Sequence, residues 1–282
     1  MQFVMFAKHL QEWPLAKAAA AVAELGFEGL DLTVREGGYV LPGEVGQALP
    51  EALRICGEAG LTVPMLTTNI TRIDRGNALQ ILETAAELGV TELKYGYHSY
   101  RRFGEFRPLV EQARADLAGV AEAAARLGVR VNLHIHSGPY VTANAPIVAQ
   151  LIADYPPEVV GAYLDLGHMV IEGGVDCWRQ GLEMLVERSP LLAIKSLGWL
   201  RDGTKHGPAS YRWAVVPLAE GPVDFTAAWR YLIAGGFDGI VTLHSEYQGG
   251  HSFRDLSVEE VIAQTRVDLA YLLACRDEAL AG

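Results

Sequence analysis

One unit recurs along the chain: an Ala-, Leu- and Glu-rich helical pattern ends at a glycine, and a short apolar or β-branched run follows at once. The joints lie at residues 24–27, 58–61, 87–90, 126–129 and 234–237. Glycine readily takes the left-handed conformation that ends a helix, after which the chain turns directly into a strand. The spacing of about 30 to 40 residues is typical of repeated βα units rather than of a solenoid.

The pattern predicts eight short strands, each followed by a longer helix. We expect strands at residues 2–7, 28–34, 61–67, 91–97, 129–136, 160–166, 190–196 and 238–245, and helices at 14–25, 45–59, 75–88, 107–127, 144–154, 175–188, 223–235 and 258–279. Strict alternation favours a closed barrel over an open doubly wound sheet, and no Gly-x-Gly-x-x-Gly follows the first strand. The fold expected is an α/β single-domain (β/α)8 TIM barrel covering residues 1–282.

Composition narrows the range of partners. Of the 282 residues, 50% are hydrophobic and 20% charged, so the chain can bury a large core. The net charge of −11 argues against a nucleic-acid partner, which requires a basic face. Cys56, Cys177 and Cys275 lie too far apart in sequence for a disulfide framework or a cysteine zinc site.

The sequence also bears on location. We find neither a signal peptide at the start nor an apolar run long enough to cross a membrane. A cytoplasmic protein with no membrane partner is therefore expected. Its oligomeric state is left open, and a homo-oligomer is one of the options.

All eight histidines lie at the end of an expected strand or in the loop that follows one. The active sites of such barrels lie at the carboxyl ends of the strands. Surface histidines without a function would be scattered over helices as well, so a functional cluster is the favoured interpretation. The histidines are His9, His98, His134, His136, His168, His206, His244 and His251.

Carboxylates accompany these histidines at two strand ends. His134 and His136 are two residues apart and point to the same side of their strand, although a buried histidine bonded to a backbone carbonyl is the ordinary alternative. Asp165 ends an apolar strand, where capping the next helix is its simplest role. Glu246 leaves the last strand two residues after His244, and an unpaired buried glutamate would be costly.

Together these groups could hold a divalent metal. Imidazole and carboxylate groups without thiolate suit Mn, Zn, Co, Fe or Mg and do not select one of them. Such an ion would act as a Lewis acid that polarises a carbonyl or orients neighbouring hydroxyls. The expected ligands are His136, Asp165, His168 and Glu246, with His134 and His244 as alternatives.

Two further strand ends carry cations. Lys195 ends the seventh expected strand. Three roles are open for it: a cation that stabilises an oxyanion, a base if it is desolvated, or a surface residue that keeps its charge in water. The longest irregular segment follows, a βα loop at about 197–222. Its aromatic and charged residues, among them Trp199 and Lys205, are typical of a lid. Arg35, after the second strand, faces the mouth or the surface.

Three of these segments carry a family resemblance. The run Leu25-Gly26-Phe27-Glu28-Gly29-Leu30-Asp31-Leu32, the run Asp165-Leu166-Gly167-His168 and the run Phe237-Asp238-Gly239-Ile240 resemble the xylose-isomerase-like barrel superfamily over the whole chain. That superfamily includes sugar isomerases, ketose 3-epimerases, inosose dehydratases and endonuclease IV. Asp31-Leu32-Thr33-Val34-Arg35 and Leu243-His244-Ser245-Glu246-Tyr247 are most similar to proteins called sugar phosphate isomerase/epimerase.

The resemblance implies a metal site from which this chain departs. Ketose epimerases hold one divalent metal with Glu, Asp, His and Glu from the last four strands, and the two glutamates move the proton. Asp165 matches the Asp, and His168 matches a substrate-contacting histidine. His134 and His244 stand at the glutamate positions, with Glu246 two residues beyond His244, and Ala193 stands at the histidine position, with Lys195 two residues beyond it. A two-glutamate relay cannot run unchanged on these residues.

The leading hypothesis is an isomerase or epimerase for a small sugar or polyol, phosphorylated or not, that abstracts a proton next to a carbonyl with the help of a metal. One alternative is a keto-sugar dehydratase or lyase working by β-elimination, and another is a non-catalytic barrel that binds a sugar or a protein. DNA repair is the least supported alternative, because the charge is wrong for it. The expected catalytic residues are Glu246, Lys195 and His134, and the expected substrate-binding residues are His168, Arg35, His98, Trp199 and His244.

Overall fold

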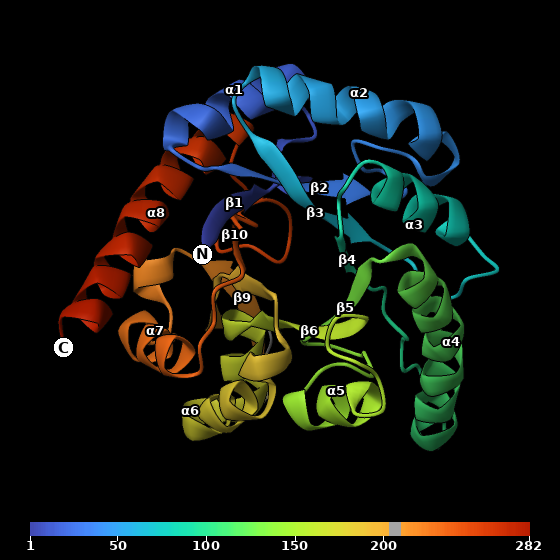
Figure 1. Ribbon diagram of the computed structural model, residues 1–282. Coiled ribbons are helices and arrows are strands. Elements are labelled where there is room, and N and C mark those ends of the chain that lie inside the picture. The colour runs from blue at the N-terminus through green and yellow to red at the C-terminus, as the bar shows by residue number, and fades with distance from the viewer. Residues whose placement is uncertain (203–209) are drawn as a thin grey trace.

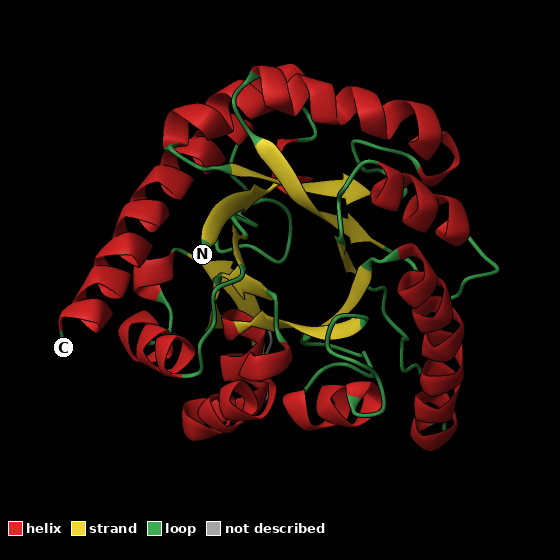
Figure 2. Cartoon of the chain, viewed as in Figure 1, coloured by secondary structure: helices red, strands yellow, loops and turns green. Residues whose placement is uncertain are grey.

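The centre of the computed structural model, which describes residues 1–202 and 210–282, is a closed barrel of parallel strands (Figures 1 and 2). Around the barrel the strands follow the order β1-β10-β7-β6-β5-β4-β3-β2. Their bounds are β1 Gln2–Phe6, β2 Gly29–Val34, β3 Thr62–Thr68, β4 Glu92–Lys94, β5 Arg130–His134, β6 Val160–Asp165, β7 Leu191–Ile194 and β10 Ile240–Leu243. The expected (β/α)8 barrel is confirmed.

Helices form a ring outside the strands (Figure 2). They are α1 Leu15–Leu25, α2 Val45–Glu58, α3 Ala78–Glu87, α4 Phe106–Leu127, α5 Ala145–Ile152, α6 Leu166–Leu185, α7 Phe225–Ala234 and α8 Val258–Ala281. α1 ends at Gly26 with φ 90° and α4 at Gly128 with φ 69°, both in the left-handed region that the helix–glycine–strand joints require. In the described part of the chain, no helix is long and apolar enough to cross a membrane.

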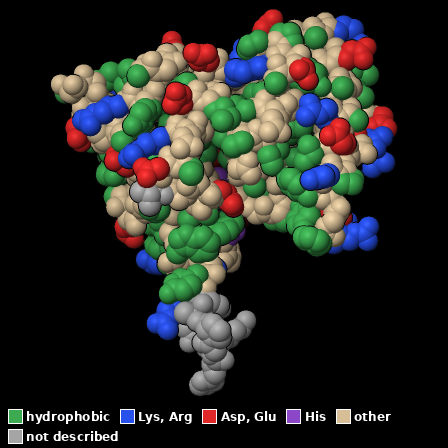
Figure 3. Space-filling model, turned by 90° about the horizontal axis from the view of Figure 1, so that it is seen from below, with side chains coloured by type: hydrophobic (Ala, Val, Ile, Leu, Met, Phe, Trp, Pro, Cys, Tyr) green, Lys and Arg blue, Asp and Glu red, His purple; other side chains and the backbone are tan. Residues whose placement is uncertain are grey.

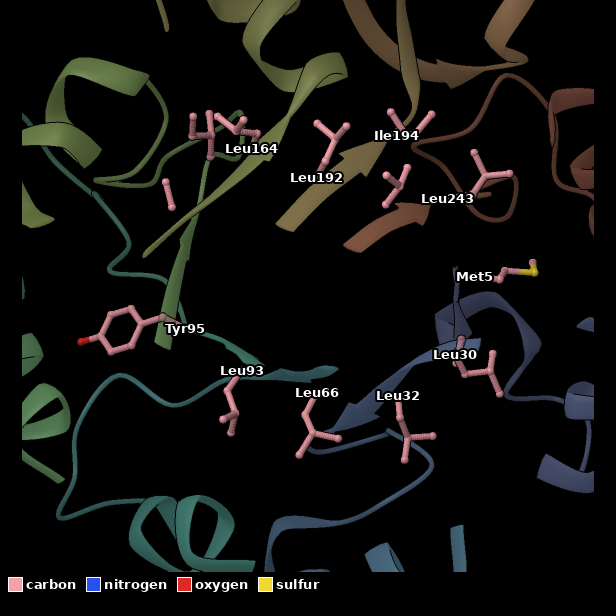
Figure 4. Close-up of a cluster of buried hydrophobic side chains, with 14 of the residues drawn as sticks. Met5, Leu30, Leu32, Leu66, Leu93, Tyr95, Leu164, Leu192, Ile194 and Leu243 are labelled. Atoms are coloured by element: carbon pink, nitrogen blue, oxygen red, sulfur yellow. The ribbon is translucent and has the colours of Figure 1, made fainter. Parts of the chain in front are cut away.

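Side chains alternate between the two faces of each strand, and this alternation positions the site. Leucines such as Leu66, Leu164 and Leu192 point outward and pack toward the helices (Figure 4). Met65, Tyr163, Leu191 and Ala193 come from strands on different sides of the barrel and pack together, so they face its interior. Two residues further along these strands lie Thr67, Asp165 and Lys195. The interior is therefore apolar in its middle and polar at the carboxyl ends of the strands.

The segment after β7 differs from the expectation of an irregular loop. It contains an antiparallel pair of strands, β8 Ser196–Asp202 and β9 Ser210–Val216, with Trp199 opposite Trp213. β9 is rich in aromatic and β-branched residues, which favour extended backbone. The hairpin projects from the body of the molecule and carries hydrophobic side chains (Figure 3). Lys205 and His206 lie outside the described residues.

Helix α6 begins nine residues earlier than expected, at Leu166 instead of residue 175. The Asp165 side chain caps it by accepting a hydrogen bond from the backbone N–H of His168. Gly174 has φ 62° and interrupts the helix with a kink, which explains why the regular helical pattern in the sequence begins only after it. The early start places His168 in the first turn of α6, at the mouth of the barrel.

Candidate active site

A cavity of about 380 Å³ opens at the carboxyl ends of the strands. A wider cavity of about 890 Å³ at the mouth shares several of its residues. The inner cavity is rich in cations and imidazoles, and its polar lining includes Lys8, Arg35, Lys94, Lys195, His134, His136, His244, Tyr97, Tyr163 and Glu246. Ligand sites of TIM barrels lie at this end.

Lys195 lies at the centre of the site, between two carboxylates. Its Nζ is 3.1 Å from Asp165 Oδ2 and 2.9 Å from Glu246 Oε1, and only 1% of the residue is exposed. Burial alone would lower the pKa of this amine, but the two carboxylates outweigh burial and raise it. Lys195 is therefore a permanent ammonium ion.

Asp165 and Glu246 are held as carboxylates. Burial would raise the pKa of Asp165, but His168, Lys195 and His134 beside it keep that pKa well below the usual value. The pKa of Glu246 is likewise well below its usual value, because Lys195 and Lys8 outweigh the effect of burial. Lys8 Nζ lies 2.8 Å from Glu246 Oε2. The capping role of Asp165 and its place in the site are compatible, because Oδ1 caps α6 and Oδ2 faces Lys195.

Two tyrosine–histidine pairs flank this centre. His134 Nε2 lies 3.0 Å from Asp165 Oδ2, and His134 Nδ1 lies 2.7 Å from the Tyr97 hydroxyl. A carboxylate only accepts, so Nε2 donates and Nδ1 accepts from Tyr97. His244 is arranged likewise, with Nδ1 3.3 Å from Glu246 Oε1 and Nε2 2.9 Å from the Tyr163 hydroxyl. Burial lowers the pKa of both histidines, so both are neutral.

His136 and His168 stack on each other at the mouth, with ring centroids 3.9 Å apart. His136 Nδ1 donates to the backbone carbonyl of Ser137 at 2.8 Å, and burial lowers its pKa to about 4. His168 is 1% exposed, and neither of its ring nitrogens has a hydrogen-bond partner among residues 1–202 and 210–282. An unpaired buried polar group costs about 1–3 kcal/mol, so His168 is poised to bond to a ligand.

The four expected metal ligands do not fit one ion. The ammonium of Lys195 lies between Asp165 and Glu246, where a cation would have to bind. Both ring nitrogens of His134 and of His244 are engaged in hydrogen bonds, which removes the alternatives. Within residues 1–202 and 210–282, the imidazole and carboxylate atoms that come within 4.8 Å of one another belong to His9, Glu246 and His251. A candidate metal site thus exists, but it contains only one of the predicted ligands.

Comparison with known proteins agrees with this architecture. Residues 19–271 match the family model described as xylose isomerase-like TIM barrel. The chain belongs to the xylose isomerase-like TIM barrel family. The expected resemblance is thereby confirmed. Comparison with curated protein sequences gives no match.

Solved structures of this xylose isomerase-like fold include sugar epimerases. The 3-keto-D-glucoside 4-epimerase from E. coli has 18% identity, covers 98% of this chain and 100% of its own, and superposes with a TM-score of 0.70. The D-psicose 3-epimerase from Clostridium cellulolyticum H10, solved with D-tagatose, has 15% identity. The match covers 98% of this chain and 99% of the epimerase, with a TM-score of 0.72. A xylose isomerase-like protein from Mycobacterium smegmatis, in complex with magnesium, has 16% identity. The match covers 98% of this chain and 97% of that protein, with a TM-score of 0.67.

The remaining predicted site residues lie in different places. Arg35 lines both cavities, and no carboxylate pairs with it among the described residues. His98 lies outside the inner cavity, with Nε2 2.9 Å from Asp116 Oδ2. Trp199 is 57% exposed, whereas its cross-strand neighbour Trp213 lines the outer cavity 6.1 Å from the His168 ring. Of the two tryptophans, Trp213 is the one at the site.

Sequence analysis missed Lys94. This last residue of β4 is 2% exposed, and its Nζ lies 3.6 Å from the Tyr97 ring centroid and 3.3 Å from the carbonyl oxygen of Thr68. Burial lowers its pKa well below the usual value, and the charges of Arg35 and Lys195 add to this effect. The signal was the same as for Lys195, a lysine at the carboxyl end of an apolar strand, but β4 has only three residues.

Proposed function

We propose that this protein is a sugar or polyol isomerase or epimerase that moves a proton next to a carbonyl group. The observation that carries the proposal is the buried Lys195 ammonium between Asp165 and Glu246, at the end of the barrel where such enzymes bind their substrates. Its family membership and the sugar epimerases among the similar structures support a small carbohydrate as the substrate.

Lys195 supplies the positive charge that the reaction needs. Its ammonium has three N–H donors, two of which are directed at carboxylates, and the residue lines the inner cavity. The third donor remains for a substrate oxygen. Removing a proton next to a carbonyl places negative charge on that oxygen, and a fixed, desolvated ammonium stabilises this charge strongly. The role proposed for Lys195 is therefore oxyanion stabilisation, and the Asp165 and Glu246 carboxylates keep it from acting as a base.

Lys94 is the group best suited to accept the proton. Its lowered pKa favours the neutral amine, and it lines the same cavity as Lys195. Glu246, which with Lys195 was one of the two expected proton-transfer groups, is a weaker candidate because Lys195 and Lys8 hold its charge. Returning the proton from Lys94 to the neighbouring carbon, while the proton of the adjacent hydroxyl passes to the former carbonyl oxygen, gives isomerisation. Epimerisation needs a donor on the opposite face of the substrate, and β10, which leads into His244 and Glu246, lies opposite β4 in the barrel order.

The experiment is proton exchange in deuterated water. A panel of ketoses and keto-sugars, free and phosphorylated, is incubated with the protein and followed by NMR. We expect deuterium at one carbon next to the carbonyl, with every hydroxyl retained, and exchange that is about 10²- to 10³-fold slower with the Lys195→Met variant. Loss of a hydroxyl would favour the dehydratase alternative. Saturable binding without exchange, unchanged by Lys195→Met, would favour a non-catalytic barrel.

A further inference from the structure

Three side chains at the rim of the barrel face one another beside the Lys195 centre, with which they share Glu246. His9 follows β1, and Glu246 and His251 lie in the loop after β10. The distance from Glu246 Oε2 is 3.7 Å to His9 Nε2 and 3.9 Å to His251 Nε2. The other carboxylate oxygen, Oε1, is the one that contacts Lys195. The two oxygens of Glu246 therefore face two different environments.

The tautomer of His9 leaves a lone pair directed at this carboxylate. His9 Nδ1 lies 2.9 Å from the side-chain oxygen of Gln248, which only accepts, so Nδ1 carries the proton. His9 is 7% exposed, and its Nε2 has no hydrogen-bond partner in the part of the chain that the structure describes. His251 Nε2 is also buried without one. The lone pair of His9 Nε2 faces a carboxylate without a proton between them and repels it, and a cation removes that repulsion.

We propose that His9, Glu246 and His251 bind a divalent transition-metal ion. Two imidazoles and one carboxylate, without thiolate, suit Zn²⁺, Co²⁺, Fe²⁺ or Mn²⁺. Ligand atoms at about 2.0–2.1 Å from a tetrahedral ion lie about 3.3 Å apart, so the group has to contract by roughly half an ångström. The hydrogen bond from His9 Nδ1–H to Gln248 is the kind of outer contact that orients a histidine ligand.

Lys8 competes with the ion for this site. Its Nζ lies 2.8 Å from Glu246 Oε2, where the metal would bind, and one third of its side chain is exposed. A long lysine side chain at the surface can turn its ammonium into water, which leaves the carboxylate oxygen for the metal. The Lys8–Glu246 ion pair therefore lowers the affinity of the site for the metal ion. The site goes beyond the proposed sugar chemistry and rests on none of its steps.

The test is metal titration of the chelator-treated, full-length protein by calorimetry with Zn²⁺ and by the visible absorption of Co²⁺. We expect about one equivalent to bind, at least tenfold weaker binding by His251→Ala, and several-fold tighter binding by Lys8→Met. His98→Ala is the matched control, because His98 pairs with Asp116 away from this site, and its binding stays at the wild-type value. His251 has a partly exposed side chain, so its truncation leaves the fold intact, as thermal unfolding verifies.

Three results would overturn the proposal: less than a tenth of an equivalent bound by the wild-type chain, wild-type affinity in His251→Ala, or loss of binding in His136→Ala but not in His251→Ala. Binding by Lys8→Met alone would show that the natural chain excludes the ion, and counts against the proposal as well. None of these measurements involves turnover, so their failure is distinct from failure of the deuterium-exchange experiment.

Discussion

Lys195 changes the chemistry that this site can perform. The resemblance to ketose epimerases predicts a metal ion at the centre of the last four strands. Here an ammonium lies between Asp165 and Glu246 and bonds to both. A lysine stabilises a developing oxyanion by charge and by one N–H, whereas a metal ion also binds two substrate oxygens at once. The proposed reaction therefore depends on how firmly Lys195 is held.

Replacing Lys195 by Met should reduce kcat by about 10²- to 10³-fold, the cost of removing one oxyanion donor. It should also lower the free energy of unfolding by about 3–5 kcal/mol, because two buried carboxylates lose their shared countercharge. Steady-state kinetics and urea unfolding measure the two effects. Lys195→Arg keeps the charge and should recover most of the stability. A kcat close to wild type in Lys195→Met would remove Lys195 from the mechanism.

Asp31 predicts a pH dependence of stability. Burial raises the pKa of this carboxyl to about 7, and Thr67 donates a hydrogen bond to it at 2.7 Å. Between about pH 4 and 7 the folded protein keeps a proton that the unfolded chain releases, so this group makes the protein less stable as the pH rises through that window. Asp31→Asn removes the effect. The free energy of unfolding of Asp31→Asn, measured relative to that of wild type, should therefore increase by on the order of 2–4 kcal/mol between about pH 4 and pH 8.

Urea unfolding of both proteins at about pH 4, 6 and 8 measures this difference. The asparagine oxygen can still accept from Thr67, so the comparison isolates the charge. A difference that stays constant with pH would show that Asp31 titrates at its ordinary pKa.

For individual residues, the sequence predicted the place in the barrel better than the side chains that each residue contacts. The periodicity of strands places His134, Asp165, His244 and Glu246 at one end of the barrel, and the structure has them there. No pattern in the sequence indicates that the Lys195 side chain reaches between two carboxylates, because that depends on the distance between β6, β7 and β10. The lysine between Asp165 and Glu246 could not be foreseen for this reason.

Among the elements, helix α6 determines where Lys195 lies. A Cβ atom on Gly167, in the first turn of α6, would lie 2.8 Å from the Lys195 carbonyl oxygen and 2.9 Å from its Cγ. Gly167→Ala should therefore push Lys195 away from the carboxylates, lower the stability by about 1–3 kcal/mol and reduce kcat. Thermal unfolding and kinetics test both effects together.

Gly57 provides the matched control. It lies in α2, and a Cβ there meets nothing within 4 Å. Gly57→Ala should raise the stability by about 0.5–1 kcal/mol, since alanine favours a helix, and leave kcat unchanged. Equal effects of the two substitutions would mean that the start of α6 does not position Lys195.

Strands and helices that follow the regular βα alternation were predictable from the sequence, whereas those that interrupt it were not. Each βα unit carries its own glycine signal, so the barrel strands and most helices lie close to their expected bounds. The β8–β9 hairpin is an insertion between β7 and α7, where the expected alternation has no place for a pair of strands. The first turns of α6 were missed because their start depends on the Asp165 cap and their continuity is broken at Gly174.

On the scale of the whole molecule, the barrel and the hairpin are separate structural units. The eight barrel strands close on themselves, and β8 and β9 pair in a sheet of their own. Stability of the fold should therefore come from the barrel and its helices, while the hairpin contributes surface to the outer cavity through Trp213 and Val215. This division makes the hairpin available for change without loss of the fold.

Replacing residues 199–213 with the two-residue turn Asn-Gly should leave one cooperative unfolding transition, with a midpoint within about 5 °C of wild type. Leu197 and Val215, which are buried against the barrel, remain in this variant. Loss of Trp213 should raise KM by about fivefold, because this partly buried ring covers His168 at the mouth, and an aromatic contact of this kind is worth on the order of 1 kcal/mol. Trp213→Ala should reproduce the change in KM, whereas Trp199→Ala, on the exposed partner of the cross-strand pair, should not. A broadened or split transition in the shortened protein would show instead that the hairpin is part of the cooperative unit, and that the eight-stranded barrel of this chain does not stand alone.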